Sequence, residues 1–337
     1  MSAGSRRTSG AGAAAEGWER RVKRIALVLP ALLLLNVSCG QGQSSIGYQP
    51  ERTDWRFGRI GGQKFITQHY HIYTTADNRV LLAHLPGFME AAHTQYLKLT
   101  GLPDEARKER MSLYVMGSRE QWAMLTQEVT GPHSELFLAI ENGGYCYEGT
   151  CVLWDMGHFA TFSVAAHEGL HQFLHYRVRN GLPSWVEEGL ATQMEGFDVY
   201  GNEAVRFNPD HNVLRPNDLR NAIASERWLG VPALLTTDPG EQIHGAPLTA
   251  PQYYGQVWAL IMYIRSQPKY LQGFQRMIAD ARLGKLPGPP MEAEARTGGE
   301  YRRAIAVPVF RKYISDDLSG FEREFRKYAS KLARIRD

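Results

Sequence analysis

The chain has 337 residues, of which 43% are hydrophobic and 22% are charged. This length allows one large domain or two modest ones, and the composition excludes a disordered, a collagen-like or a polytopic membrane protein. Six of the 38 basic residues but only two of the 35 acidic residues lie before residue 39, so the rest of the chain is close to neutral. A basic surface for nucleic acid is therefore not predicted.

The first 39 residues have the parts of an export signal. A basic segment precedes an apolar run, Ile25–Leu35, which is shorter than the ~20 residues of a membrane-spanning helix. Ser38 and Cys39 follow and resemble the lipobox of bacterial lipoproteins, although Asn36 stands where that pattern has Leu. We therefore predict a signal peptide over residues 1–39, lipidation of Cys39 and a lipid anchor in a membrane of the cell envelope. Soluble secretion is the alternative.

Residues 40–55 are polar and rich in Gly and Ser, which predicts a flexible tether. The folded domain is expected to span residues 56–337. It begins with a strand over Phe65–Tyr73, where β-forming residues alternate with polar ones. A helix over residues 78–100 and a second strand over Met111–Met116 follow.

Two cysteines flank the next predicted turn. The segment Tyr145–Asp155 is expected to form a hairpin with Gly149 in its turn. Because export delivers a chain to an oxidising compartment, we expect a disulfide between Cys146 and Cys151. Two free, half-buried thiols are the alternative.

The second half of the chain is predicted to be mainly helical. A long helix is expected over residues 160–179, and the next begins at Pro183 and Ser184 and closes near Gly196. Later segments with a helical pattern cover residues 216–224, 251–266, 269–283 and 318–335, with a Gly- and Pro-rich loop over residues 284–299. Strands first and helices afterwards indicate an α+β fold.

The long helix contains the sequence His-Glu-Gly-Leu-His. His167 and His171 are four residues apart, so both imidazoles lie on one helix face and can bind one metal ion. Glu168 lies one residue further round, where it can accept a hydrogen bond from a water at the metal and act as general base. The flanking residues are small or apolar, which indicates a buried helix, and buried histidines need polar partners.

A catalytic zinc ion takes three protein ligands and keeps one position open. His175 lies one turn beyond His171, but a third His along a straight helix is too far away to complete a tetrahedron, so we assign it a supporting or packing role. Ser184 and Glu187 match a capping box at the start of the next helix. That leaves Glu188, about 100° further round, as the third ligand.

The segments HEGLH and WVEEGLA together resemble the gluzincin metallopeptidases, which include thermolysin-like enzymes and zinc aminopeptidases, and come closest to uncharacterised exported bacterial members of that clan. The motifs cover residues 164–191. The resemblance implies a thermolysin-like fold, in which a small N-terminal sheet and an active-site helix precede a mainly helical C-terminal half. It also implies one Zn²⁺ per chain, bound by His167, His171 and Glu188, with Glu168 as the base.

The same resemblance implies further site residues. Gluzincins of the aminopeptidase type use a downstream Tyr to stabilise the oxyanion, which points to Tyr254, with Tyr253 and His244 as alternatives. Glu141 resembles the Glu that holds a substrate's free amine, although Glu-Asn-Gly-Gly is equally a turn sequence. The strand that contains Leu153 precedes the zinc helix and is expected to bind a peptide as an added strand.

The resemblance predicts an exported zinc-dependent peptidase that acts on peptides or proteins. Thermolysin-like enzymes carry an Asp four residues after the ligand Glu, whereas this chain has Thr192 there, so another residue must orient the histidine. The alternative is a non-catalytic binding lipoprotein with a structural metal. Glu168 favours catalysis, because a structural zinc site needs no base and usually has four protein ligands.

Overall fold

The structure is a computed structural model, and it describes residues 50–200, 204–225, 227–238, 250–289 and 298–334. The predicted signal peptide with Cys39, most of the predicted tether, and His244 lie outside these residues. Within the described part of the chain, no helix has both the length and the apolar character needed to span a membrane.

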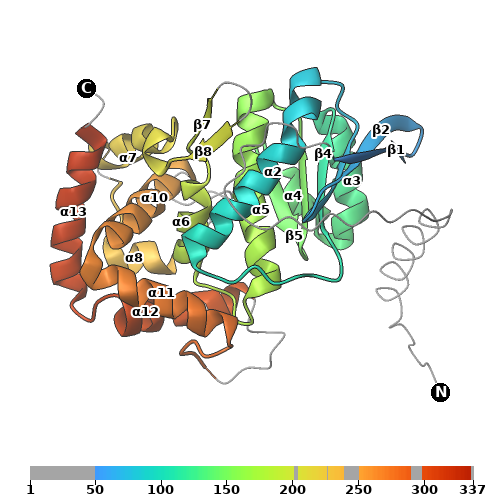
Figure 1. Ribbon diagram of the computed structural model, residues 1–337. Helices are drawn as coiled ribbons and strands as arrows, with labels where there is room; N and C mark the ends of the chain where they lie inside the picture. The colour runs from blue at the N-terminus through green and yellow to red at the C-terminus, as the bar shows by residue number, and fades with distance from the viewer. Residues whose placement is uncertain (1–49, 201–203, 226, 239–249, 290–297, 335–337) are drawn as a thin grey trace, which may run out of the picture.

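The N-terminal half of the described chain is built around a mixed six-stranded sheet (Figure 1). In spatial order its strands are β1 (Glu51–Phe57), β2 (Ile60–Ile66), β3 (Tyr70–Thr74), β4 (Met111–Met116), β6 (Thr150–Trp154) and β5 (Gly144–Tyr147). Strands β1 to β3 are antiparallel, β4 and β6 run parallel to β3, and β5 is the antiparallel edge strand.

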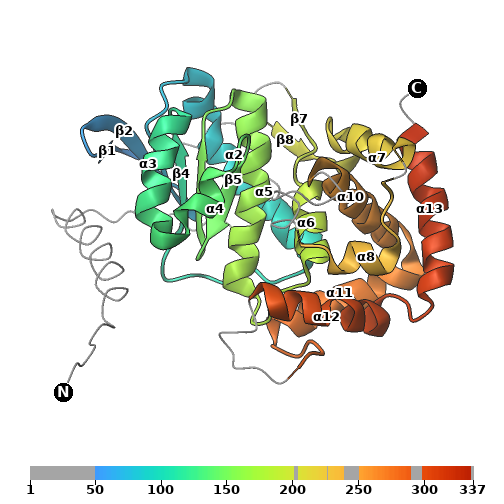
Figure 2. The same cartoon turned by 180° about the vertical axis from the view of Figure 1, so that it is seen from behind.

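Helices cover both faces of this sheet, as Figures 1 and 2 show. On β4, Leu113 and Val115 pack in the cluster that includes α2 and α5, while Tyr114 and Met116 pack with α3 on the other face. This alternation follows from the two-residue period of a strand. The covering helices are α2 (Arg79–Thr100), α3 (Arg119–Thr130), α4 (Ser134–Leu138) and α5 (His158–Arg177).

The second half of the chain is mainly helical and packs around α10, which contacts α6, α7, α11 and α13. One hydrophobic cluster runs from Phe65 to Ala333 and includes residues of both halves. The helices are α6 (Ser184–Gln193), α7 (Arg215–Ala224), α8 (Val231–Thr236), α10 (Ala250–Ser266), α11 (Pro268–Arg282), α12 (Gly299–Tyr313) and α13 (Leu318–Arg334); a hairpin of β7 (Phe197–Tyr200) and β8 (Ala204–Phe207) follows α6.

The predicted α+β class is confirmed, and two boundaries are corrected. The predicted tether is too long, because residues 51–55 belong to β1. The single strand predicted over Phe65–Tyr73 is two antiparallel strands, β2 and β3. Thr67 forms the turn between them: its backbone N–H donates to Tyr70 O, and its Oγ1 accepts from Tyr70 N, both at 2.9 Å.

Glycine lets α6 and α10 approach closely. A Cβ atom added to Gly189 would overlap the Ile261 side chain and lie 3.0 Å from the Val257 carbonyl oxygen. Gly189 belongs to the WVEEGLA segment, so this contact helps to fix the helix that carries Glu188. The glycine of this motif therefore allows α6 and α10 to pack closely.

We expect Gly189→Ala to lower the free energy of unfolding by roughly 1–3 kcal/mol, because the added methyl group must push α6 away from α10. Urea unfolding followed by circular dichroism measures the change. Gly61→Ala is the matched control, since a Cβ atom there meets nothing within 4 Å. Equal stability of the two variants would contradict the close approach of α6 and α10.

Candidate metal centre

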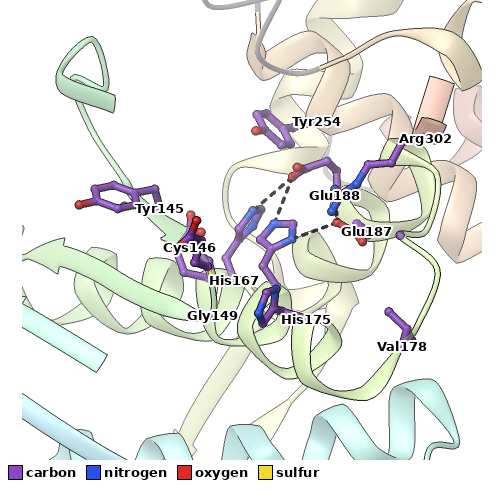
Figure 3. A pocket seen from close by; sticks show the side chains of 15 residues that line it. Tyr145, Cys146, Gly149, His167, His175, Val178, Glu187, Glu188, Tyr254 and Arg302 are labelled. Carbon is purple, nitrogen blue, oxygen red and sulfur yellow. Dashed lines mark hydrogen bonds and ion pairs between the residues drawn. The ribbon is translucent and has the colours of Figure 1, made fainter. Parts of the chain in front are cut away.

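Two imidazoles and one carboxylate converge where α5 meets α6 (Figure 3). His167 and His171 lie one turn apart on α5, and Glu188 lies on α6. Glu188 Oε2 is 3.4 Å from His167 Nε2 and 3.6 Å from His171 Nε2, and the three ligand atoms lie within 4.8 Å of one another. The three residues predicted as ligands are therefore brought together and could hold one metal ion.

A buried oxygen of Glu188 lacks a hydrogen bond. The Oε2 atom that faces both imidazoles is inaccessible to solvent and has no hydrogen-bond partner. Burial would raise the pKa of Glu188, but His171 and His167 outweigh burial and hold this pKa well below its usual range. An unpaired buried carboxylate oxygen is costly, and a cation between the three ligand atoms would satisfy it.

The same electrostatics act on the histidines. Burial would lower the pKa of His167, but its close contact with the Glu188 carboxylate and its hydrogen bond to Glu195 raise this pKa to about 9. Burial would also lower the pKa of His171, and the charge of Glu188 raises it well above its usual value. A metal ion that binds here at neutral pH must therefore displace protons from the imidazoles.

Glu195 orients His167, which the sequence did not predict. His167 Nδ1 donates to Glu195 Oε1 at 2.8 Å, so Nε2 is left to face Glu188. Arg215 binds both Glu195 oxygens, at 2.7 and 2.8 Å, and Asn212 Nδ2 donates to Oε2 at 3.1 Å. Burial would raise the pKa of Glu195, but Arg215 and His167 lower it to about 2. The orienting carboxylate is therefore ionised.

The sequence pattern of the helix does not reveal this role. Thr192, four residues after Glu188, donates its hydroxyl proton to Gly189 O at 2.8 Å. Glu195 comes seven residues after Glu188, but α6 ends at Gln193, so helix periodicity does not predict where Glu195 lies. Its carboxylate reaches His167 from the bend that follows α6.

The capping-box interpretation of Glu187 is wrong. Ser184 is the first residue of α6. The residue at the capping position is Pro183, which provides no side-chain hydrogen bond to the helix. Glu187 Oε2 instead accepts a 2.6 Å hydrogen bond from Arg302 Nη1 of α12 and lies 3.8 Å from His171 Nδ1. The buried carboxylate of Glu187 is therefore balanced by Arg302 and His171. It contacts His171 at Nδ1, whereas Glu188 lies near Nε2 of the same ring.

The two predicted catalytic residues line one cavity of about 330 Å³. Burial raises the pKa of Glu168 against the opposing effect of both site histidines. Burial also raises the pKa of Tyr254 far above its usual value, so its hydroxyl stays protonated. The Tyr254 ring centroid lies 6.0 Å from that of His167, and Arg215 Cζ lies 4.9 Å from the ring. Tyr253 is buried and does not line the cavity.

The β5–β6 hairpin forms another wall of this cavity. Its turn has positive φ at Glu148 (47°) and Gly149 (74°), as tight hairpin turns require. Gly149 O accepts hydrogen bonds from Gln172 Nε2 at 2.7 Å and from Tyr176 Oη at 3.1 Å, so α5 also holds the hairpin. His175 lines the cavity beside this turn and is not one of the grouped metal ligands, in keeping with a supporting role.

The structure differs from three predictions. Glu141 is exposed in a turn and does not line the cavity. Leu153 is buried in β6, which already pairs with β4 and β5, so this strand has no free edge for a peptide. Cys146 and Cys151 are cross-strand partners but are free thiols. The buried Cys151 thiol donates to the Glu168 carbonyl oxygen at 3.1 Å and so contacts the histidine-bearing helix.

Comparison of the whole chain with protein-family models, with curated proteins and with solved structures gave no match. The likeness to gluzincins therefore rests on the two sequence motifs. What the site can do must be argued from its own residues and their geometry.

We expect Glu195→Gln to weaken Zn²⁺ binding about 10- to 100-fold, because the amide no longer supports His167 with a negative charge. Competition with a chromophoric chelator measures the affinity. Asp218→Asn is the control: Asp218 Oδ2 also binds Arg215, at 2.8 Å, but has no contact with His167. The same loss in both variants would assign the effect to Arg215 and overturn the orienting role of Glu195.

Proposed function

We propose that this protein is an exported zinc-dependent peptidase with a thermolysin-like catalytic domain. The observation that carries the proposal is the position of a further carboxylate, Glu168, beside the three grouped residues. Glu168 lines the cavity beside His167, His171 and Glu188 without belonging to that ligand group. A three-ligand site with an adjacent free base is the arrangement of catalytic zinc sites. Export and a lipid anchor at Cys39 rest on the sequence of the leader.

Zinc fits the residues that are present. Imidazole nitrogen and carboxylate oxygen are among its usual ligands, and the buried Glu188 Oε2, which accepts no hydrogen bond, would be satisfied by a cation. His167, His171 and Glu188 would hold it. When bound, zinc supplies Lewis-acid chemistry, lowering the pKa of a nearby water and polarising a substrate carbonyl.

Glu168 moves the proton in the proposed reaction. Its carboxylate takes one proton from the attacking water as the new C–O bond forms at the peptide carbonyl carbon. The C–N bond then breaks, and Glu168 returns that proton to the leaving amine. Burial raises the pKa of Glu168 towards neutral pH. A carboxyl group with such a pKa can act first as base and then as acid.

Tyr254 is placed to stabilise the charge that develops on the carbonyl oxygen. Its ring centroid lies 6.0 Å from that of His167, and it lines the same cavity as Glu168. Because its hydroxyl stays protonated, it can donate a hydrogen bond to an oxyanion. The neighbouring Arg215 fixes the ring from its face.

The edge strand of the sheet supports a peptide as the substrate. Among the described strands, β5 pairs with β6 alone, and Gly144 and Cys146 of β5 line the cavity. An unpaired strand edge offers alternating N–H and C=O groups that an extended peptide can match. The peptide-binding strand is therefore proposed to be β5, in place of the inner strand that contains Leu153.

We expect Glu168→Gln to lower peptide cleavage by roughly 10²- to 10⁴-fold while the bound zinc is retained, because the amide is no base. Cleavage of a mixed peptide library by the zinc-loaded protein, read by mass spectrometry, gives the rate. Glu141→Gln, which changes an exposed carboxylate outside the cavity, is the control and should cleave like the parent. Undiminished cleavage by Glu168→Gln would refute the mechanism.

Tyr254→Phe should lower kcat about 10²- to 10³-fold with little change in KM, since the lost hydrogen bond forms only as charge develops on the oxygen. Steady-state kinetics on the best peptide from the library separate the two constants. Tyr253→Phe is the matched control, because this neighbouring hydroxyl has no hydrogen-bond partner and does not line the cavity. A rise in KM at constant kcat would assign Tyr254 to substrate binding.

A further inference from the structure

We propose that the protein holds a second divalent-metal site, distinct from the catalytic one, with His69, His93 and Asp104 as ligands. These residues come from three segments: the turn between β2 and β3, helix α2, and the loop that follows α2. One ligand atom from each lies within 4.8 Å of the others. The metal class is a zinc-type divalent cation, since two imidazoles and one carboxylate are ligands that zinc prefers.

His93 provides the strongest sign of a missing partner. Its side chain is 1% exposed, and its Nε2 atom is buried without a hydrogen-bond partner. The nearest charged oxygen, Asp104 Oδ1, is 4.0 Å away, too far for a hydrogen bond. A buried imidazole nitrogen without a partner is costly, and here it is directed at a carboxylate and a second imidazole.

Glu90 prepares His69 as a ligand. Its Oε2 lies 2.5 Å from His69 Nδ1, and its Oε1 accepts from the His69 backbone N–H at 2.9 Å. With the Nδ1 proton donated to Glu90, His69 Nε2 presents a lone pair, and it faces Asp104 Oδ2 at 3.7 Å. A cation between these two atoms would be bound by both. Carboxylate–histidine pairs of this kind are the usual support of metal-bound imidazoles.

The imidazole rings of His69 and His93 stack on each other. The His69 and His93 centroids are 3.7 Å apart with an interplanar angle of 14°, and Phe173 of α5 packs edge-on against His93 at 5.6 Å. Ligand atoms around a tetrahedral zinc ion are roughly 3.3 Å apart, given Zn–N and Zn–O distances of about 2 Å. Side-chain rotations that tilt the two stacked rings and bring the three ligand atoms, now within 4.8 Å of one another, closer together would close the site around an ion.

Exposure and charge also suit a metal ion. The His69 side chain is 20% exposed and that of Asp104 is 46% exposed, so ions and a water ligand can reach the site from solvent. Arg177 Nη2 lies 3.5 Å from Asp104 Oδ1, and its guanidinium also lies near Glu105 and the Pro103 carbonyl oxygen. The positive charge of Arg177 is thus shared among three acceptors. The metal would join the β2–β3 turn and α2 to the loop that follows α2, and Arg177 at the end of α5 contacts that loop through Asp104.

The test is metal stoichiometry of the full chain. The protein is stripped with a chelator, equilibrated with Zn²⁺ alone, desalted and measured by mass spectrometry of the metal. We expect two zinc ions in the parent, one in Asp104→Asn and one in Glu188→Gln. Glu105→Gln is the matched control, because Glu105 contacts the same Arg177 without being a ligand, and it should keep two. Glu90→Gln should weaken the second site about 10- to 100-fold.

The outcomes separate this site from the proposed catalytic one. One zinc ion in the parent that is lost in Glu188→Gln but kept in Asp104→Asn would overturn the second site and leave the peptidase proposal intact. One zinc ion lost only in Asp104→Asn would support the second site and contradict the catalytic one. His69→Gln repeats the test at a partly exposed ligand, and circular dichroism of each variant shows that loss of metal is not loss of fold.

Discussion

The carboxylate of Glu188, with one oxygen fully buried, is the constraint around which the site is built. A charged group with little access to solvent must be balanced by opposite charge, and breaking such a balance is far more costly than forming it is favourable. Charges therefore alternate outward from Glu188: two imidazoles face it, and Glu195 and Glu187 face those imidazoles from behind. Outermost, Arg215 binds Glu195 and Arg302 binds Glu187, and these two guanidinium groups compensate the outer carboxylates.

This alternation explains why the helical half of the protein must pack against the sheet half. Arg215 comes from α7 and Arg302 from α12, while the histidines lie on α5, which covers the sheet. Each outer charge is therefore contributed by an element far away in sequence. The continuous hydrophobic core from Phe65 to Ala333 supplies the free energy that holds these elements in place. The polar network in turn specifies one arrangement of them.

Features that depend on contacts between residues close in sequence could be predicted, and features that depend on distant residues could not. The relation of His167 to His171 is local, fixed by one helical turn, and the prediction was right. The structure also groups Glu188, and not Glu187, with the two histidines, although the reason given for this distinction was wrong: Glu187 is bound by Arg302, 115 residues later, and not by a helix cap. No local pattern contains that partner.

Strand order was equally beyond local reasoning. The hairpin of β5 and β6 was predicted from its turn, but which arm lies at the edge depends on β6 pairing with β4, a contact between distant segments. The α+β class, the ends of α2 and the position of β4 could be read from periodicity and capping, since Asn78 accepts hydrogen bonds from Val80 and Leu81 at the start of α2. The turn at Thr67 was missed because β-formers continue through it.

Helix α5 links all parts of this arrangement. His171 and Phe173 are two residues apart, so they point about 200° apart round the helix. His171 faces the candidate metal centre, while Phe173 packs against His93 on α2. Between them Gln172 holds the β5–β6 turn through Gly149 O. One helix thus contacts Glu188, the β5–β6 hairpin and the cluster of His69 and His93 at once. A shift of α5 would disturb all three, which is why this helix is anchored on both sides by polar contacts as well as by the core.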